Sequence, residues 1–88
     1  MQIIFLPNAD ADLAYFVKSG NKSIIKRITQ LIKAIKNNPY SGVGKPEPLK
    51  YQLSGLWSRR INKEHRLVYE VVESESKILI HSIRGHYK

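Results

Sequence analysis

The spacing of apolar residues predicts a strand and two helices in the first half of the chain. The run "QIIFL" at residues 2–6 is typical of a short buried strand, and a proline closes it. We expect a first helix from Asn8, as its N-cap, to about Lys18, where a Ser-Gly pair ends it. Acidic residues in its first turn would suit the helix dipole.

The second helix is predicted from an apolar stripe with helical spacing. It should begin at Asn21 or Ser23 and end at the Asn-Asn-Pro of residues 37–39. Its basic residues fall largely on the other faces, so the stripe should be the buried side. The stripe consists of Ile24, Ile25, Ile28, Leu31, Ile32 and Ile35.

The second half of the chain is predicted to be a stiff loop followed by three strands. Residues 41–48, "SGVGKPEP", hold two glycines and two prolines, which is typical of a loop. "LWSRRI" (56–61), "HRLVYEVV" (65–72) and "KILIHSIR" (77–84) should be strands, and the short turns between them require antiparallel pairing. We therefore expect one α+β domain over residues 1–88, in the order β-α-α-β-β-β. Two N-terminal helices would pack on one face of a small, mainly antiparallel sheet.

Alternation along the strands decides which side chains the uncovered face of this sheet carries. Side chains two residues apart share a face, so Arg59 and Arg60 point to opposite sides, and Arg66 shares a face with Val68. Each arginine alone could make only a surface ion pair worth about 0–1 kcal/mol. As a set with few acids to pair with, they fit phosphate, because a guanidinium can bind two phosphate oxygens at once.

Charge adds a class of partner to this picture. The 88 residues include 15 Lys or Arg and 7 Asp or Glu, which gives a net charge of +8 and a pI near 9.9. Such a charge favours a polyanion or an acidic protein as partner, and a basic surface without a target is the alternative. With no cysteine and three scattered histidines, we expect neither a metal nor another cofactor. No apolar run approaches the about 20 residues of a membrane span, so we expect a cytoplasmic protein without a membrane partner.

One acidic residue stands out in the basic central region. From Leu13 to Lys63, Glu47 is the only Asp or Glu among eleven Lys and Arg residues, and a proline flanks it on each side. Protein surfaces usually mix the two signs of charge. A carboxylate held alone on a stiff turn among cations is a candidate for acid–base chemistry.

The stretch around Glu47 resembles a known family. "KPEPLKYQLSGLWSRRINKEHRLVYEV", residues 45–71, is similar to the signature of the YoeB/Txe toxins of the RelE-like superfamily. The two-helix start, the loop "NPYSGVGKPEPLK" and a chain end in His-Tyr extend the resemblance over nearly the whole length. It implies the RelE-like microbial RNase fold and a type II toxin. Such a toxin is a metal-independent endoribonuclease that cuts mRNA in the A site of the 70S ribosome.

The resemblance also implies partners and residue roles. The partners would be a YefM/Phd-type antitoxin, operator DNA only through the antitoxin complex, and a second copy in a homodimer. Glu47 would be the general base, Arg66 would stabilise transition-state charge, and His86 would be the general acid, with Tyr87 beside it. Phosphate contacts would come from Lys50 and Arg60. We expect further RNA contacts from Arg59, His65 and Arg84.

The chemistry of RNA cleavage agrees with these implied roles. RNA carries its own nucleophile, the 2′-OH, so cleavage needs a base, cations around the phosphorane and an acid for the leaving 5′-oxygen. The chain end "RGHYK" departs from the commonest pattern at Gly85 and Lys88. Gly85 could loosen His86, and Lys88 moves the terminal carboxylate one residue from Tyr87, but neither change removes a catalytic group.

Two other functions stay open from the residues alone. A non-catalytic RNA- or DNA-binding module would use the same basic face, with Glu47 only orienting Lys50 or Arg60. A structural partner for an acidic protein is the third reading. Glu47, Arg66 and His86 discriminate among them, because a binder needs the cations but neither the acid nor the imidazole. The remaining candidates are expected to be structural: His81, Trp57, Tyr69 and Tyr15.

Overall fold

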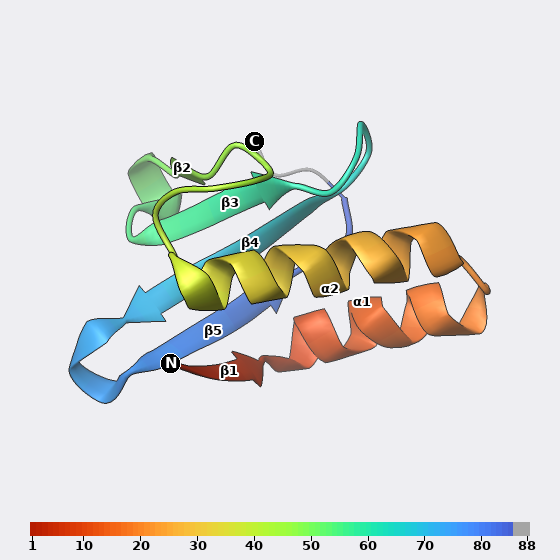
Figure 1. Cartoon of the computed structure of the whole chain (residues 1–88), viewed down its shortest axis with the longest axis horizontal. Coiled ribbons are helices and arrows are strands. Elements are labelled where there is room, and N and C mark those ends of the chain that lie inside the picture. The colour runs from red at the N-terminus through yellow and green to blue at the C-terminus, as the bar shows by residue number, and fades with distance from the viewer. Residues whose placement is uncertain (86–88) are drawn as a thin grey trace.

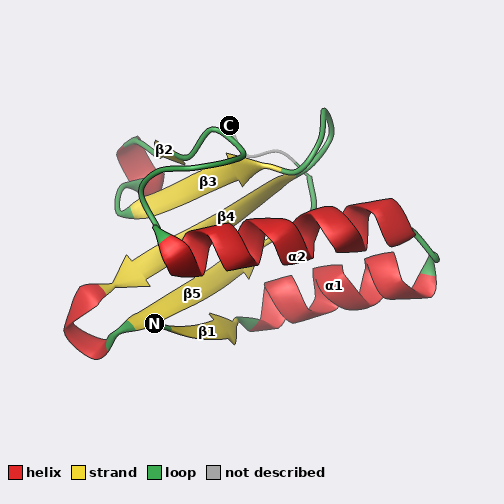
Figure 2. Ribbon diagram, in the orientation of Figure 1, coloured by secondary structure: helices red, strands yellow, loops and turns green. Residues whose placement is uncertain are grey.

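The structure is a computed structural model that describes residues 1–85, and it has two helices on one face of a five-stranded sheet (Figure 1). The α+β class and the two-helix layer agree with the sequence prediction, as the colouring by secondary structure makes plain (Figure 2). No helix within residues 1–85 is long and apolar enough to cross a membrane. The elements are β1 (Gln2–Phe5), α1 (Pro7–Lys18), α2 (Lys22–Asn37), β2 (Glu47–Pro48), β3 (Leu56–Arg60), β4 (Arg66–Val72) and β5 (Lys77–Ser82), with short 3-10 turns at Tyr51–Leu53 and Glu73–Glu75.

The sheet has the order β1-β5-β4-β3-β2. β3, β4 and β5 pair antiparallel, as their short connections required. β1 instead runs parallel to β5, from Gln2 opposite Lys77 to Phe5 opposite Ile80. A parallel neighbour needs a long crossover, and here the whole α1–β4 segment supplies it.

The predicted loop over residues 41–48 is wrong at its end, where Glu47 and Pro48 form strand β2. Glu47 lies opposite Ser58 and Pro48 opposite Trp57 on β3, in antiparallel register. Proline cannot donate a hydrogen bond to a neighbouring strand, so it is confined to positions such as sheet edges. β2 is such an edge strand, which explains how a proline-flanked residue enters the sheet.

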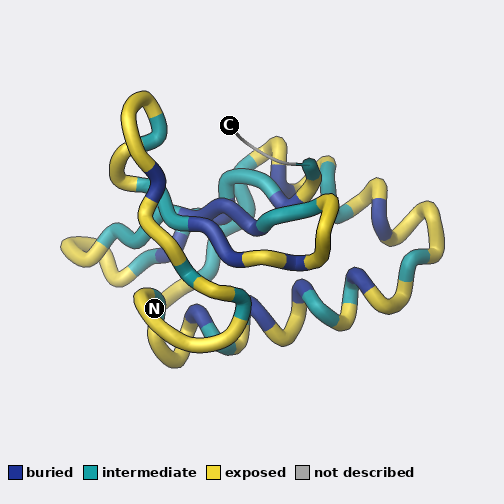
Figure 3. Tube along the Cα trace, turned by 90° about the horizontal axis from the view of Figure 1, so that it is seen from above, coloured by how far each residue is buried: buried dark blue, intermediate teal, exposed yellow. Residues whose placement is uncertain are grey.

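Helix α2 supplies much of the core through the predicted stripe. Its cap is Asn21, whose Oδ1 accepts a hydrogen bond from the Ile24 amide at 3.2 Å. Ile25 and Ile32 are partly buried beside the stripe. Buried positions recur along the helix at one face (Figure 3). They are Ile24, Ile28, Leu31 and Ile35.

Helix α1 begins two residues earlier than predicted. Its cap is Leu6, with Pro7 at the first helical position, and Asn8 is not the cap. Proline suits that position because the first amides of a helix have no intrahelical acceptor and its φ is already helical. On its buried side α1 places Ala9 and Phe16 in the core.

A bulge in β5 changes which residues face the core near the chain end. Val68 lies opposite Ser82, but Tyr69 lies opposite Ile80, so His81 is an extra residue between the two pairs. An extra residue shifts the alternation of all later side chains by one. Ile83 therefore joins the core with no exposed surface, on the same side as Ile80.

Candidate active site

The edge strand β2 places Glu47 on the face of the sheet that the helices leave open. Glu47 lies opposite Ser58, and on the next strand Arg66 lies opposite Arg60. Opposed residues share a face, and alternation puts Ser58 and Arg60 on the same one. The other face of β3 and β4 carries Leu67, which packs in the core with helix residues.

Glu47 and Arg66 meet across β3. The Glu47 Oε1 lies 3.5 Å from the Arg66 Nη1, and the two side chains are 54% and 20% exposed. Because β3 lies between their strands, the pair depends on the sheet rather than on sequence proximity. The structure thus brings together the predicted base and the predicted transition-state cation, in a position that solvent and a ligand can reach.

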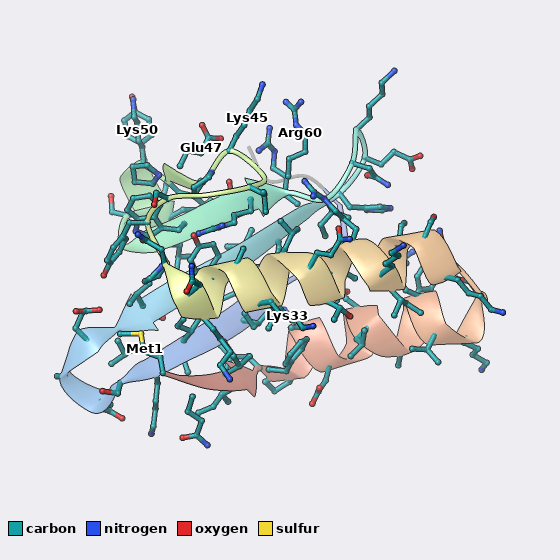
Figure 4. The ribbon with its side chains drawn as sticks, in the orientation of Figure 1. Met1, Lys33, Lys45, Glu47, Lys50 and Arg60 are labelled. Carbon is teal, nitrogen blue, oxygen red and sulfur yellow. The ribbon has the colours of Figure 1, made fainter. Side chains whose placement is uncertain are left out.

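Three further cations surround Glu47 at this edge. In Figure 4, Lys45, Lys50 and Arg60 rise from the same end of the molecule as Glu47, away from the helices. All three are exposed. Lys45 had not been singled out from the sequence, although its place two residues before Glu47 in "KPEP" was a signal. We call Glu47, Arg66, Lys45, Lys50 and Arg60 the basic edge site.

The buried Arg59 holds the loop that leads into this site. Its Nη2 donates to the Asn38 carbonyl at 2.6 Å and to the Ser41 carbonyl at 3.0 Å, and its Nη1 donates to the Val43 carbonyl at 3.1 Å. Its Nε donates to the Tyr69 hydroxyl at 3.1 Å. One guanidinium therefore fixes three carbonyls of the segment that connects α2 to β2.

Tyr69 completes this anchor from the core side. Its hydroxyl donates to the Pro39 carbonyl at 2.7 Å while it accepts from Arg59. Burial raises the pKa of Tyr69 above its ordinary value, because the phenolate would be poorly solvated there, and the Arg59 guanidinium opposes that rise. The neutral hydroxyl is the form that can donate to Pro39.

Gly44 lets the same loop pass close to both α2 and β3. Its φ is +87°, and a Cβ there would lie 2.8 Å from the Leu31 Cδ2 and 3.1 Å from the Arg59 Cβ. Its carbonyl accepts from the Arg60 amide at 2.7 Å. A side chain would push the loop outward, and Glu47 follows only three residues later.

The structure does not support the predicted RNA contact by Arg59. This side chain has no exposed surface, and its donors are committed to the loop carbonyls and Tyr69. Alternation had correctly separated Arg59 from Arg60, but it gave no sign that the Arg59 face was the covered one. Arg59 is a structural residue that holds the loop leading to the basic edge site.

His65 and Arg84 also lie apart from Glu47, on the side of α1. The His65 ring packs edge-on against Phe16, with centroids 5.1 Å apart, and the Arg84 guanidinium lies 3.6 Å from the centre of the Tyr15 ring. Both contacts are with helix α1, whereas Glu47 and Arg66 share the opposite face of the sheet. Neither residue is brought to the basic edge site.

Other candidates divide between structural positions and the undescribed chain end. His81 contacts Glu70, with the His81 Nε2 at 2.9 Å from Oε1, which suits its predicted structural role. Tyr69 lies in the core and Trp57 packs against it, while Tyr15 is about half exposed. The predicted general acid His86 and its neighbour Tyr87 lie outside the described residues.

The described part of the site contains one carboxylate. Within residues 1–85, no three His, Asp or Glu side chains gather closely enough to hold a metal ion. The basic edge site instead combines one carboxylate with four cations. That arrangement can receive a phosphodiester and accept a proton beside it.

The chain is similar to known toxins over nearly all its length. A family model described as the YoeB-like toxin of bacterial type II toxin–antitoxin systems matches residues 5–87. The toxin YoeB of Synechocystis is 50% identical over 88 residues, which is 100% of this chain and 99% of that protein. The toxin YoeB of Escherichia coli K12 is 46% identical over 87 residues, covering 99% and 100% of the two chains.

Solved structures show the same likeness in three dimensions. A YoeB/ParE toxin from Agrobacterium tumefaciens aligns with a TM-score of 0.94 at 36% identity, covering 99% of this chain and 100% of that one. A chain of a YoeB–YefM complex from Staphylococcus aureus aligns with a TM-score of 0.86 at 46% identity, covering 99% and 98%. A YoeB dimer from the same organism aligns with a TM-score of 0.87 at 45% identity, covering 99% and 98%.

Proposed function

The chain belongs to the YoeB-like toxins of bacterial type II toxin–antitoxin systems, and we propose that it acts as a metal-independent endoribonuclease on mRNA in the ribosomal A site. The observation that carries this proposal is the pairing of Glu47 with Arg66 at 3.5 Å on the uncovered sheet face. A binding surface for RNA needs cations alone. A carboxylate among these cations, next to Arg66 as the least exposed of the four, fits proton transfer beside a phosphate.

The proposed reaction begins at the 2′-OH of the RNA. Glu47 accepts the hydroxyl proton, and the oxygen attacks the adjacent phosphorus to form a phosphorane, which becomes a cyclic phosphate when the 5′-oxygen leaves. Arg66 stabilises the negative charge that develops on the phosphorane oxygens. Cleavage of the bond to the 5′-oxygen then requires a proton, which His86 would supply, with Tyr87 beside it.

The exposed cations of the basic edge site have a different task. Lys50 and Arg60, with Lys45, would hold the phosphates on either side of the scissile bond, since each reaches solvent on the same edge as Glu47. Their role is positioning, and the ribosome would add to it by presenting the mRNA. Effective positioning can lower a reaction barrier by roughly 7–11 kcal/mol in favourable cases.

The proposed partners follow from the same surface and from the relatives. The S. aureus relatives form a YoeB–YefM complex and a YoeB dimer. For this chain we propose a YefM/Phd-type antitoxin, whose acidic segment would bind the basic edge site and block it. A homodimer, and contact with operator DNA through the antitoxin complex alone, belong to the same proposal.

The test of the proposal is Glu47→Gln. Glutamine keeps the length and hydrogen-bonding reach of the side chain but cannot take the 2′-OH proton, so single-turnover cleavage should fall by roughly 10²–10⁴-fold. Affinity for the programmed ribosome should hold or rise, because the net charge goes from +8 to +9. Cleavage would be measured by primer extension on saturated ribosome complexes, with binding measured in parallel.

Glu75→Gln is the matched control. It makes the same change in net charge at the turn after β4, where Glu75 contacts Lys77 at 3.0 Å on the surface. Its cleavage rate should equal that of the parent protein. Unchanged cleavage by Glu47→Gln at unchanged binding would remove Glu47 as the base, and a ribosome-bound water or nucleotide would then take that role.

A further inference from the structure

His65 makes an unusual contact with the backbone near the chain end. The Gly85 amide donates a hydrogen bond to the His65 Nδ1 at 2.8 Å. The same glycine accepts, through its carbonyl, a hydrogen bond from the Arg66 amide at 3.1 Å. His65, just before β4, and Arg66, its first residue, thus bind both peptide groups of Gly85. Gly85 had been expected to loosen the residue that follows it, but its own backbone is held on both sides.

This contact requires that the Nδ1 of the His65 ring accepts a hydrogen bond. A backbone amide can only donate, so the Nδ1 must be the unprotonated nitrogen, and a neutral ring then carries its proton on the Nε2. Protonation of the Nδ1 would set two donors against each other. The contact is therefore made by neutral imidazole only.

The surroundings of His65 hold the ring in place for this task. One side packs against Phe16 of α1, and the His65 carbonyl accepts from the Ile61 and Asn62 amides at 3.0 and 3.3 Å, which closes the turn between β3 and β4. The outer side borders an open hollow of about 620 Å³ between that turn and the tip of the α1–α2 hairpin. The ring is thus supported by helix, turn and strand together.

The position of this contact relative to the basic edge site gives it a consequence. Arg66 sends its side chain to Glu47 and its amide to Gly85, so one residue joins the site to the segment after β5. His86 is the next residue in the chain after Gly85. With φ at +84°, Gly85 adopts a backbone conformation that other residues rarely adopt, so the course of the chain at this point depends on holding it.

We propose that His65 is a positioning residue for the cleavage reaction. From the helix side of the sheet, its neutral ring holds Gly85 against Arg66 and so sets the point from which the chain continues to His86 and Tyr87. This inference rests on the proposed nuclease function. In this role the His65 side chain acts through Gly85 and Arg66 and does not need to contact the RNA.

Two substitutions separate the hydrogen bond from the packing of the ring. His65→Phe keeps an aromatic ring against Phe16 but has no acceptor. His65→Asn loses the ring but keeps an acceptor, because the Asn Oδ1 is bonded to Cγ just as the His Nδ1 is. The first should lower single-turnover cleavage by roughly 10- to 100-fold with ribosome affinity unchanged. The second should restore cleavage to within about threefold of the parent, which is close to neutral on the scale of such effects.

A measurement without RNA tests the same contact directly. Hydrogen exchange of the Gly85 amide, followed by NMR, should be faster in His65→Phe than in the parent protein and should slow again in His65→Asn. Urea unfolding of each variant confirms that the comparison is made on folded protein. This readout holds whether or not the protein cleaves RNA.

The outcomes distinguish the positioning role from the function on which it rests. A parent protein that does not cleave A-site mRNA refutes the proposed function. The exchange data then show by themselves whether His65 holds the Gly85 amide. A cleaving parent with His65→Phe equally active refutes the positioning role. Equal losses in both variants also refute it, because the ring and not the acceptor would then matter. Equal exchange of the Gly85 amide in the parent and in His65→Phe shows that the His65 ring does not hold Gly85.

Discussion

Replacing Arg59 with methionine tests how the loop before Glu47 is held. Methionine has similar length and no donors, so Arg59→Met removes the bonds to the carbonyls of residues 38, 41 and 43 while filling much of the same space. None of the bonding partners of Arg59 within residues 1–85 is a carboxylate, so the substitution leaves no unpaired acid behind. What remains is a set of carbonyls without donors.

The expected loss of stability is about 3 kcal/mol. A hydrogen bond from a charged donor contributes about 1.5–3 kcal/mol, but the loop is largely exposed and water can replace part of each bond, so about 1 kcal/mol per carbonyl is appropriate. For a domain of this size that loss lowers the melting temperature by roughly 12–24 °C. In urea, with a slope of about 1.5 kcal/mol per M, the midpoint falls by about 2 M.

Arg60→Met is the control, one residue away on the other face of the sheet. The Arg60 side chain is exposed at the basic edge site, and its backbone bonds to Gly44 and Arg27 do not involve the side chain. Its stability should change by less than about 0.5 kcal/mol, while cleavage should fall. If Arg59→Met unfolds at the urea midpoint of the parent, the loop does not depend on its guanidinium and the anchor described above is refuted.

Two other substitutions probe the same loop. Gly44→Ala should lower stability by about 1–3 kcal/mol, because the new Cβ would collide with Leu31. The collision should displace Glu47 and so reduce cleavage beyond what the loss of stability explains. Parental cleavage in a folded variant would contradict this. Burial raises the pKa of Tyr69 in the folded protein above its ordinary value of about 10. The stability that the neutral hydroxyl contributes is therefore complete below about pH 10 and is lost as the pH rises through the folded-state pKa. Urea midpoints should therefore fall less between pH 8 and pH 11 in Tyr69→Phe than in the parent, and an equal fall in both proteins would contradict this account.

Local sequence signals predicted helix α2 well. The apolar stripe of α2 is buried at four of its six positions and partly buried at Ile25 and Ile32. The cap at Asn21 was one of two alternatives in the sequence, and its side chain makes the capping bond. These features depend on residues within one or two helical turns, where spacing and capping chemistry are sufficient.

Features that depend on distant residues were not visible in the sequence. Alternation separated Arg59 from Arg60 but could not say that the loop after α2 would fold over Arg59. The sequence around His81 reads as a regular strand and gives no sign of the bulge, yet the bulge places Ile83 in the core. β2 is only two residues long, too short for any periodicity. The roles of Glu47 and Arg66 were implied by the family resemblance, but their pairing depends on the register of three strands.

The parallel pairing of β1 with β5 has a consequence for how the protein folds as it is synthesised. Gln2 pairs with Lys77, so the first strand to be synthesised can complete its ladder only when the last strand is available. Closing so long a loop costs conformational entropy before any contact repays it, and such non-local pairs form slowly. We expect β1 to dock late, after the helical hairpin and the β3–β4–β5 meander have formed. A ribosome making this chain would therefore carry an incomplete sheet until β5 has emerged.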